Sequence, residues 1–190
     1  VTSTAVSGAF PTAAVLDNFN RTNGGIGSNW SGAPGGYSIV SNKLDVGNGD
    51  ALYWNAASFG ANQDVYVTLS TIDTSADEID LLLKVQGNYW GDGVLEVYYK
   101  PSTGTVEVWT FTQAQDWVQR GTAITVTFAA GDRFGARAKA DGTVEVYKNS
   151  TLLGSRSITA WPHYGAGGRI GLWMVNASAA LLDNFGGGNS

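Results

Sequence analysis

The sequence has no cysteine, one methionine and one histidine, His163, among its 190 residues. Without cysteine the chain cannot form a disulfide, a thiolate nucleophile or a cysteine-ligated zinc site, and a single histidine rules out a histidine-rich metal site. Charged residues are only 14% of the chain, and its 11 basic residues form no cluster that could neutralise phosphates. This argues against nucleic-acid binding. No run of about 18 apolar residues is present, so the sequence predicts no membrane insertion.

Glycine is abundant, with 26 residues, and so are aromatic residues, with 7 Trp, 8 Tyr and 7 Phe. Short runs rich in Val, Ile, Thr, Tyr and Trp recur at intervals of roughly 8 to 15 residues and are bounded by Gly, Asn, Asp and Ser. No long window has apolar residues at the spacing of an amphipathic helix. The pattern predicts an all-β protein of two packed sheets or a barrel.

Two hairpins can be predicted with their register. A turn at residues 101–104 places Tyr98 opposite Glu107 and Glu96 opposite Trp109, which separates polar and aromatic side chains from apolar ones. For the second hairpin a two-residue turn at 141–142 competes with a three-residue loop that carries a glycine bulge. We favour the bulged loop, which gathers the apolar side chains on one face and places a charged pair opposite each other. That pair is Arg137 and Glu145.

The ends of the chain share a short repeat, because residues 16–19 and 182–185 both read Leu-Asp-Asn-Phe. We interpret the two copies as neighbouring edge elements that bring the ends of one domain together. Residues 1–14 are predicted to be a linker or N-terminal arm, residues 15–186 a single domain, and residues 187–190 a flexible tail. Linkers at both ends suggest a module of a longer protein.

Several motifs together resemble a known superfamily. They are residues 16–21 followed by 27–30, Gly131-Asp132-Arg133-Phe134, the stretch 141–147, Leu153-Gly154-Ser155, and 168–172 followed by 182–185. In order and spacing they resemble the concanavalin A-like lectin and glucanase superfamily, in particular laminin-G-like domains of bacterial or phage surface proteins. The resemblance implies a jelly-roll β-sandwich of two antiparallel sheets, a face that meets glycans, and an extracellular or cell-surface location.

Aromatic side chains in Gly- and Asn-rich loops or on the polar hairpin face predict a carbohydrate site, since sugar rings stack on Trp and Tyr while planar polar groups bind their hydroxyls. The predicted ligand-binding residues are Trp54, Asn88, Tyr89, Trp90, Asp92, Glu96, Tyr98, Glu107 and Trp109. Trp117, Trp161 and Tyr164 lie in similar surroundings. Trp30 and Trp173 are assigned to the core.

Two carboxylate pairs raise the question of hydrolysis. Glu78 and Asp80 resemble the start of the Glu-x-Asp-x(-x)-Glu catalytic strand of the glucanase branch, but leucines occupy both places for the second glutamate. We interpret them as solvated charges at the start of a strand. Glu96 and Glu107 form a second pair, for which catalysis, hydrogen bonding to sugar and an ordinary exposed face all stay open.

A structural calcium ion is an alternative role for other acidic residues. Family members often hold calcium where the terminal strands meet, and Asp17 and Asp183 resemble ligands there. The loop at residues 45–50 also offers oxygen ligands, and Asx turns would explain all of these residues without a metal.

The sequence therefore predicts an extracellular, lectin-like module that binds a polysaccharide or surface glycan without catalysis. Two alternatives remain. One is a structural subunit of a surface appendage, filament or virion that self-associates. The other is a glycoside hydrolase.

Overall fold

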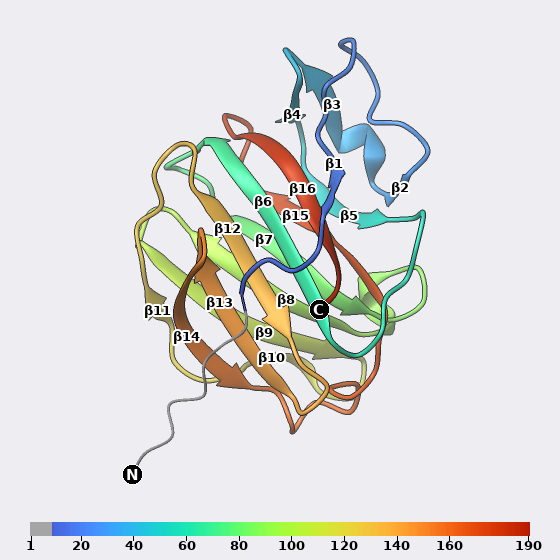
Figure 1. Ribbon diagram of the computed structural model, residues 1–190, viewed down its shortest axis with the longest axis vertical. Helices are drawn as coiled ribbons and strands as arrows, with labels where there is room; N and C mark the ends of the chain where they lie inside the picture. The colour runs from blue at the N-terminus through green and yellow to red at the C-terminus, as the bar shows by residue number, and fades with distance from the viewer. Residues whose placement is uncertain (1–8) are drawn as a thin grey trace.

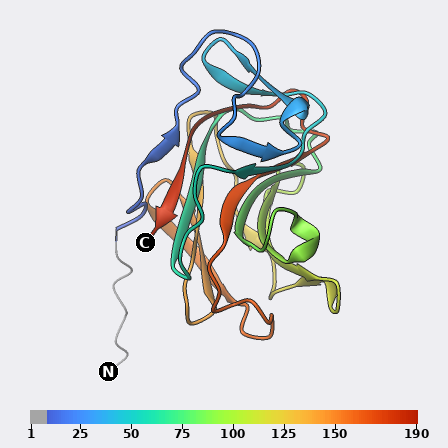
Figure 2. The same ribbon diagram turned by 90° about the vertical axis from the view of Figure 1, so that its right-hand side faces the viewer.

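The computed structural model describes residues 9–190 and consists of two antiparallel sheets packed face to face (Figures 1 and 2). Within that range the only helical elements are two 3-10 turns, η1 (Pro34–Gly36) and η2 (Trp90–Asp92). The predicted all-β jelly-roll sandwich is therefore confirmed.

The two sheets each contain eight strands, and the chain crosses repeatedly between them. Sheet A has the order β14-β13-β12-β6-β16-β4-β3, with β1 paired to β16; sheet B has the order β10-β9-β8-β7-β15-β5-β2, with β11 paired to β9. The strands of sheet A are β1 (Val15–Asp17), β3 (Tyr37–Val40), β4 (Lys43–Val46), β6 (Gln63–Thr71), β12 (Arg133–Ala138), β13 (Thr143–Lys148), β14 (Thr151–Ser157) and β16 (Leu181–Asn189). Those of sheet B are β2 (Trp30–Gly32), β5 (Asp50–Trp54), β7 (Glu78–Val85), β8 (Val94–Lys100), β9 (Thr105–Thr112), β10 (Asp116–Gln119), β11 (Ile124–Thr125) and β15 (Arg169–Val175).

The core lies between the sheets and is built by alternation along the strands. Ile79, Leu81 and Leu83 of β7 point inward and are fully buried, and they meet inward residues of sheet A such as Phe134 and Ala136. Successive side chains of a strand point to opposite faces, so Asp80 and Leu82, which lie between these three residues, face outward. Burial of the inner faces is the main stabilising contribution to the sandwich.

Both predicted hairpins are confirmed in type and register. The β8–β9 pair and the β12–β13 pair each carry the cross-strand partners expected from the separation of polar and apolar faces. The partners are Tyr98 with Glu107 and Glu96 with Trp109 in the first hairpin, and Arg137 with Glu145 in the second.

The two ends of the chain meet in sheet A, where β1 pairs with β16, so the repeated segments are neighbours as predicted. They are not both edge elements as expected, because β16 lies between β6 and β4. The flexible tail expected at residues 187–190 is wrong as far as Asn189, because residues 187–189 pair with β6. A side chain at Gly187 would place its Cβ 2.4 Å from the carbonyl oxygen of Asp64, so the close approach of these backbones requires glycine.

The described part of the N-terminal arm, residues 9–14, is also not a loose linker; residues 1–8 of the predicted arm lie outside the described part. Phe10 is buried on the outer face of sheet A and stacks on Tyr147, with ring centroids 4.0 Å apart. The chain from there to β1 runs across sheet A in Figure 1. Gly135 of β12 makes room for the ring, since a Cβ there would lie 2.4 Å from it.

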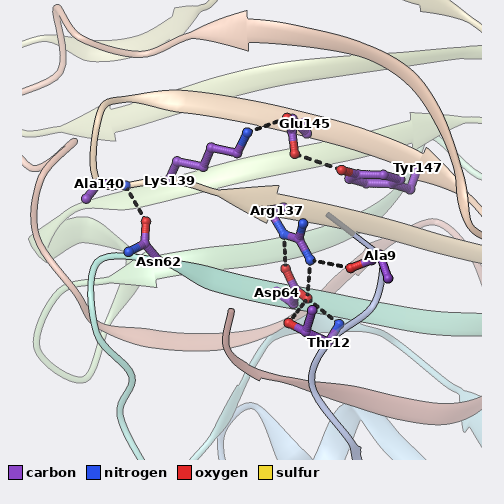
Figure 3. Close-up of polar contacts among 9 residues, drawn as sticks. All are labelled: Ala9, Thr12, Asn62, Asp64, Arg137, Lys139, Ala140, Glu145 and Tyr147. Carbon is purple, nitrogen blue, oxygen red and sulfur yellow. Dashed lines mark hydrogen bonds and ion pairs between the residues drawn. The ribbon is translucent and has the colours of Figure 1, made fainter. Parts of the chain in front are cut away.

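Polar contacts also hold this arm to sheet A (Figure 3). Arg137 forms a two-pronged ion pair with Asp64, through Nε to Oδ1 at 2.7 Å and Nη2 to Oδ2 at 3.0 Å. Thr12 donates to the same carboxylate from its backbone N–H at 2.8 Å and from its hydroxyl at 3.0 Å. Arg137 also donates to the carbonyl of Ala9. The domain therefore extends from the arm to Asn189, beyond the predicted limits of 15 and 186.

Among the described residues, no helix has the length and apolar character needed to cross a membrane.

Candidate functional site

A cluster of carboxyl groups lies on the outer face of sheet B. Because Ile79, Leu81 and Leu83 point into the core, Glu78, Asp80 and Leu82 project outward along β7. Glu96 of β8 is paired directly with Leu82 and therefore projects on the same face. The neighbouring strand thus supplies a carboxyl group beside one of the two places where the second glutamate of the Glu-x-Asp-x(-x)-Glu pattern is missing.

Glu78, Asp80 and Glu96, here called the carboxyl trio, are in close contact. One carboxylate oxygen from each can be chosen so that all three lie within 4.8 Å of one another. Asp80 is fully buried, Glu96 is 5% exposed and Glu78 is half-buried. The interpretation of Glu78 and Asp80 as solvated charges is therefore wrong.

The trio has an unusual electrostatic environment. Burial is the main cause that raises the pKa of Asp80, and the charges of Glu96 and Glu78 add to it. Burial and the charge of Glu78 raise the pKa of Glu96 to about 8. The pKa of Glu78 is also raised, chiefly by burial and then by the charge of Asp77, although the charge of Lys100 acts against this. Charged forms of all three carboxyl groups are thus costly unless a proton or a cation is shared among them.

Two members of the trio and four aromatic side chains line a cavity of about 280 Å³, here called the carboxyl cleft. Its lining consists of Glu78, Glu96, Tyr98, Trp109, Trp117 and Trp173. The Tyr98 hydroxyl and the Trp109 indole N–H both donate to Oε2 of Glu107, at 3.1 and 2.9 Å. Glu107 therefore fixes the orientation of two rings of the cleft.

A second cavity of about 460 Å³ adjoins the carboxyl cleft, because Trp173 lines both. The η2 turn lies over this outer side of sheet B in Figure 2, and the backbone N–H of Trp90 donates to the Tyr53 hydroxyl at 3.0 Å. Trp90 packs against Trp173 and Trp117, with ring centroids 5.4 and 5.8 Å apart. The second cavity is lined by Gly32, Ala33, Asp50, Ala51, Tyr53, Asn88, Tyr89, Trp90 and Trp173.

The structure brings together most of the ligand-binding residues predicted from sequence, in two neighbouring groups. Glu96, Tyr98 and Trp109 line the carboxyl cleft, and Glu107 is hydrogen-bonded to the last two, while Asn88, Tyr89 and Trp90 line the second cavity. Two predictions differ. Trp54 is a core residue, 6% exposed, whose ring packs edge-on against Trp30. Asp92 is exposed and lines neither cavity.

Sequence reasoning missed Trp173 as a cleft residue and did not select Trp117. Trp173 is half-buried and points outward, because Leu172 and Met174 on either side of it point into the core. The alternation of β15 could have identified it, as the alternation of β7 could have placed Glu78 and Asp80 on one face.

The predicted calcium ligands Asp17 and Asp183 lie outside these cavities. The Asp17 carboxylate accepts hydrogen bonds from Arg21 at 2.7 and 3.0 Å and from the Trp30 indole at 2.9 Å. Burial alone would raise the pKa of Asp17, but these bonds outweigh it and lower the pKa. Asp183 lies 3.4 Å from the Lys43 ammonium. Calcium at these residues stays a prediction, and at Asp17 the ion would have to compete with arginine.

Comparison with known proteins identifies the fold. No family model and no curated protein matches the sequence. Among solved structures, LamA from Z. galactanivorans in complex with laminaritriose and laminaritetraose has a TM-score of 0.60 at 11% identity, covering 94% of this chain and 99% of that one. A Bacteroides ovatus GH16 protein in complex with the product G4G4G3G has a TM-score of 0.62 at 9% identity, covering 90% and 97%.

The carbohydrate-binding module CBM66 from Bacillus subtilis has a TM-score of 0.56 at 12% identity, covering 85% of this chain and 93% of that one. At such identities the likeness shows the fold and not the activity. The narrower resemblance to laminin-G-like domains stays a prediction. The two-sheet architecture and these neighbours together show that the protein has the jelly-roll sandwich fold that these structures share.

Proposed function

We propose that this protein binds an uncharged polysaccharide in the carboxyl cleft and the adjoining second cavity. The observation that carries the proposal is the set of half-buried indole rings, Trp109, Trp117 and Trp173, beside carboxyl groups on one sheet face. Apolar faces of sugar rings stack on such indoles, and the carboxyl groups accept hydrogen bonds from sugar hydroxyls. Since such polysaccharides are found mainly outside cells, we also propose that the protein acts there.

The continuity of the two cavities favours a chain of several sugar units over a single monosaccharide. Trp173 is the wall shared by both cavities, and Trp90 packs against it from η2. A ligand that spans them would contact rings held by β9, β10, β15 and η2. The structural neighbours in complex with laminari-oligosaccharides and with a mixed-linkage product make those glucans the first ligands to test.

The test is affinity electrophoresis and titration calorimetry with laminari-oligosaccharides and mixed-linkage glucan oligosaccharides. We compare the parent protein with Trp109→Ala, which removes a ring from the cleft. The matched control is Tyr164→Ala, which removes an exposed ring that lines neither cavity. We expect a loss of affinity of about tenfold or more for Trp109→Ala and none for the control, because a desolvated aromatic anchor carries much of a binding energy.

Absence of binding to these and to other neutral polysaccharides would refute the proposal. If Trp109→Ala and Tyr164→Ala changed the affinity equally, the ligand would bind away from the carboxyl cleft. Circular dichroism of each variant verifies that the fold is retained.

Glycoside hydrolysis is a second candidate, favoured by one observation. Retaining glycosidases use two carboxyl groups about 5 Å apart, and oxygens of Glu78 and Glu96 lie within 4.8 Å of each other. With a pKa of about 8, Glu96 is protonated at neutral pH and could donate its proton to the leaving oxygen. Glu78 lines the cleft and could attack the anomeric carbon, with water then releasing the sugar.

Hydrolysis is tested by the release of reducing ends from the same glucans during prolonged incubation. If the protein is a hydrolase, Glu78→Gln and Glu96→Gln abolish product release while Trp109→Ala weakens it. A protein that binds the glucan and releases no product is a binding module.

A further inference from the structure

Within residues 9–190, no Lys, Arg or His side chain forms an ion pair with the carboxyl trio. The five ion pairs found among residues 9–190 involve other carboxylates, and none includes Glu78, Asp80 or Glu96. Lys100 lies on the same sheet face and its charge acts on Glu78, but it forms no ion pair with it. Up to three negative charges therefore meet here without a counter-charge in contact.

Asp80 is the most informative member of the trio. It is fully buried, and neither of its carboxylate oxygens accepts a hydrogen bond from an N–H or hydroxyl group of the described residues. The carboxyl group of Glu96 is within reach of Asp80, but it can donate only while it is protonated. Leaving a buried polar group unsatisfied costs roughly 1 to 3 kcal/mol, and more for a charged one. Asp64, also fully buried, shows the usual solution, since Arg137 and Thr12 satisfy it. The environment of Asp80 lacks such permanent donors, so when the trio is ionised its oxygens need a partner that is not part of the chain.

We propose that Glu78, Asp80 and Glu96 bind a divalent cation of the calcium class at the floor of the carboxyl cleft. Calcium takes carboxylate oxygens at about 2.3 to 2.6 Å, so two oxygens bound to one ion lie at most about 5 Å apart. The trio meets this limit, because its three ligand oxygens lie within 4.8 Å of one another. Two ligands come from β7 and one from the hydrogen-bonded neighbour β8, so the sheet itself holds the ligand set.

The ion would have an open side toward the cleft. Asp80 is sealed beneath the surface, whereas Glu78 and Glu96 line the cavity that Trp109, Trp117 and Trp173 enclose. Calcium needs six to eight oxygens, so water or sugar hydroxyls would complete its shell from this side. The involvement of sugar hydroxyls rests on the proposed function, whereas binding of the ion does not.

Terbium(III), which replaces calcium at oxygen sites and emits when nearby tryptophans are excited, is the probe for this site. We measure its emission with the parent protein, with competition by CaCl2, and confirm calcium binding by titration calorimetry. Asp80→Asn removes one ligand charge with little change of shape. Asp77→Asn is the matched control, because Asp77 is exposed, precedes Glu78 and is not a member of the trio.

We expect saturable emission with one site per chain, displacement by calcium and at least a tenfold weaker affinity in Asp80→Asn. The loss in Asp77→Asn should be much smaller, because the exposed Asp77 acts on Glu78 through its charge alone. If Asp80→Asn does not fold by circular dichroism, Glu78→Gln at the half-buried position replaces it with the same expectation. No saturable calcium-competed emission in the parent protein overturns the proposal. Equal affinity of the parent and the trio variants also overturns it and locates the ion elsewhere.

Glucan binding measured in CaCl2 and in EDTA separates this proposal from the proposed function. If calcium binds to the trio and no glycan binds, the cation site stands and the proposed function fails. If glucan binds equally in both solutions and no calcium binds, the cation site fails and the proposed function stands.

Discussion

At the scale of single residues, the buried carboxyl groups of β7 and β8 are the most consequential feature of the molecule. Burial raises the pKa of Asp80 and of Glu96, the latter to about 8. In the unfolded chain both groups would ionise near pH 4. Between pH 4 and about 8, the folded state therefore binds more protons than the unfolded state. Folding opposes the ionisation of Asp80 and Glu96 in this range.

The pH dependence of stability follows from this difference. With metal removed by EDTA, the free energy of unfolding falls as pH rises from about 5 to 8, because stability decreases with pH wherever the folded state holds more protons. Asp80→Asn removes one of the interacting groups, so we expect a weaker decline and a higher free energy of unfolding at pH 8 than in the parent. Urea unfolding followed by tryptophan fluorescence at several pH values measures this. If the free energy of unfolding fell equally steeply with pH in the parent and in Asp80→Asn, the prediction would be contradicted.

Single residues also show where sequence reasoning failed. Trp54 lies near glycine- and asparagine-rich segments, yet it is a core residue packed against Trp30 and Phe185. Trp173 lies in an apolar run, yet it lines the carboxyl cleft. Composition of the surroundings does not decide whether an aromatic ring faces inward, whereas the alternation of its strand does.

At the scale of elements, the end of β7 is held by a buried lysine. The Lys84 ammonium donates to the carbonyl oxygens of Ala61, Tyr164 and Ala166 at 2.7, 2.6 and 3.0 Å and so ties two loops to the strand. Lys84→Met should lower the free energy of unfolding by about 3 kcal/mol, because it leaves these acceptors without a donor. The control Lys100→Met should change it by less than about 0.5 kcal/mol. Urea denaturation measures the free energy of unfolding of both variants. Equal values would show that the contacts of Lys84 with the carbonyl oxygens do not stabilise the fold.

The N-terminal arm is a second element whose packing has a measurable consequence. Phe10 stacks on Tyr147 and lies over Gly135, while Thr12 donates to Asp64. We expect Phe10→Ala to cost about 3 kcal/mol and to release residues 9–14, because removing a buried ring leaves a cavity. Hydrogen–deuterium exchange of this segment measures the release. Unchanged protection would mean that the polar contacts in Figure 3 suffice to hold the arm.

Elements differed in how well they could be predicted. The β8–β9 hairpin was predictable because its polar and apolar faces alternate cleanly on both strands, so only one register separates them. The arm was not, because an isolated Phe10 in a Ser-, Thr- and Ala-rich segment carries no periodicity. Its place depends on a glycine and two tyrosines contributed by distant strands.

At the scale of the whole molecule, the distribution of apolar surface bears on the structural-subunit alternative. The exposed large apolar residues of the described chain are few and come from separate strands and loops: Val15, Val40, Tyr89, Leu152 and Tyr164. Only Tyr89 adjoins a larger aromatic surface, because it packs on Trp90 with ring centroids 4.9 Å apart beside the two cavities. We have proposed that this surface takes a glycan, and the other four residues come from strands or loops that are not part of it. We expect a monomer in light scattering after size-exclusion chromatography. Large assemblies that form without glycan would instead favour the filament or virion role.

The sequence by itself determined the all-β class, the two hairpin registers and the meeting of the chain ends. These follow from local alternation, turn chemistry and a repeated segment. Only the tertiary structure decided that Glu96 comes beside Asp80 and Glu78, that Trp173 and Trp117 close the same cleft, and that the arm and tail belong to sheet A. The physical reason is that a single strand determines which side chains share its face, whereas the pairing of distant strands determines which faces meet.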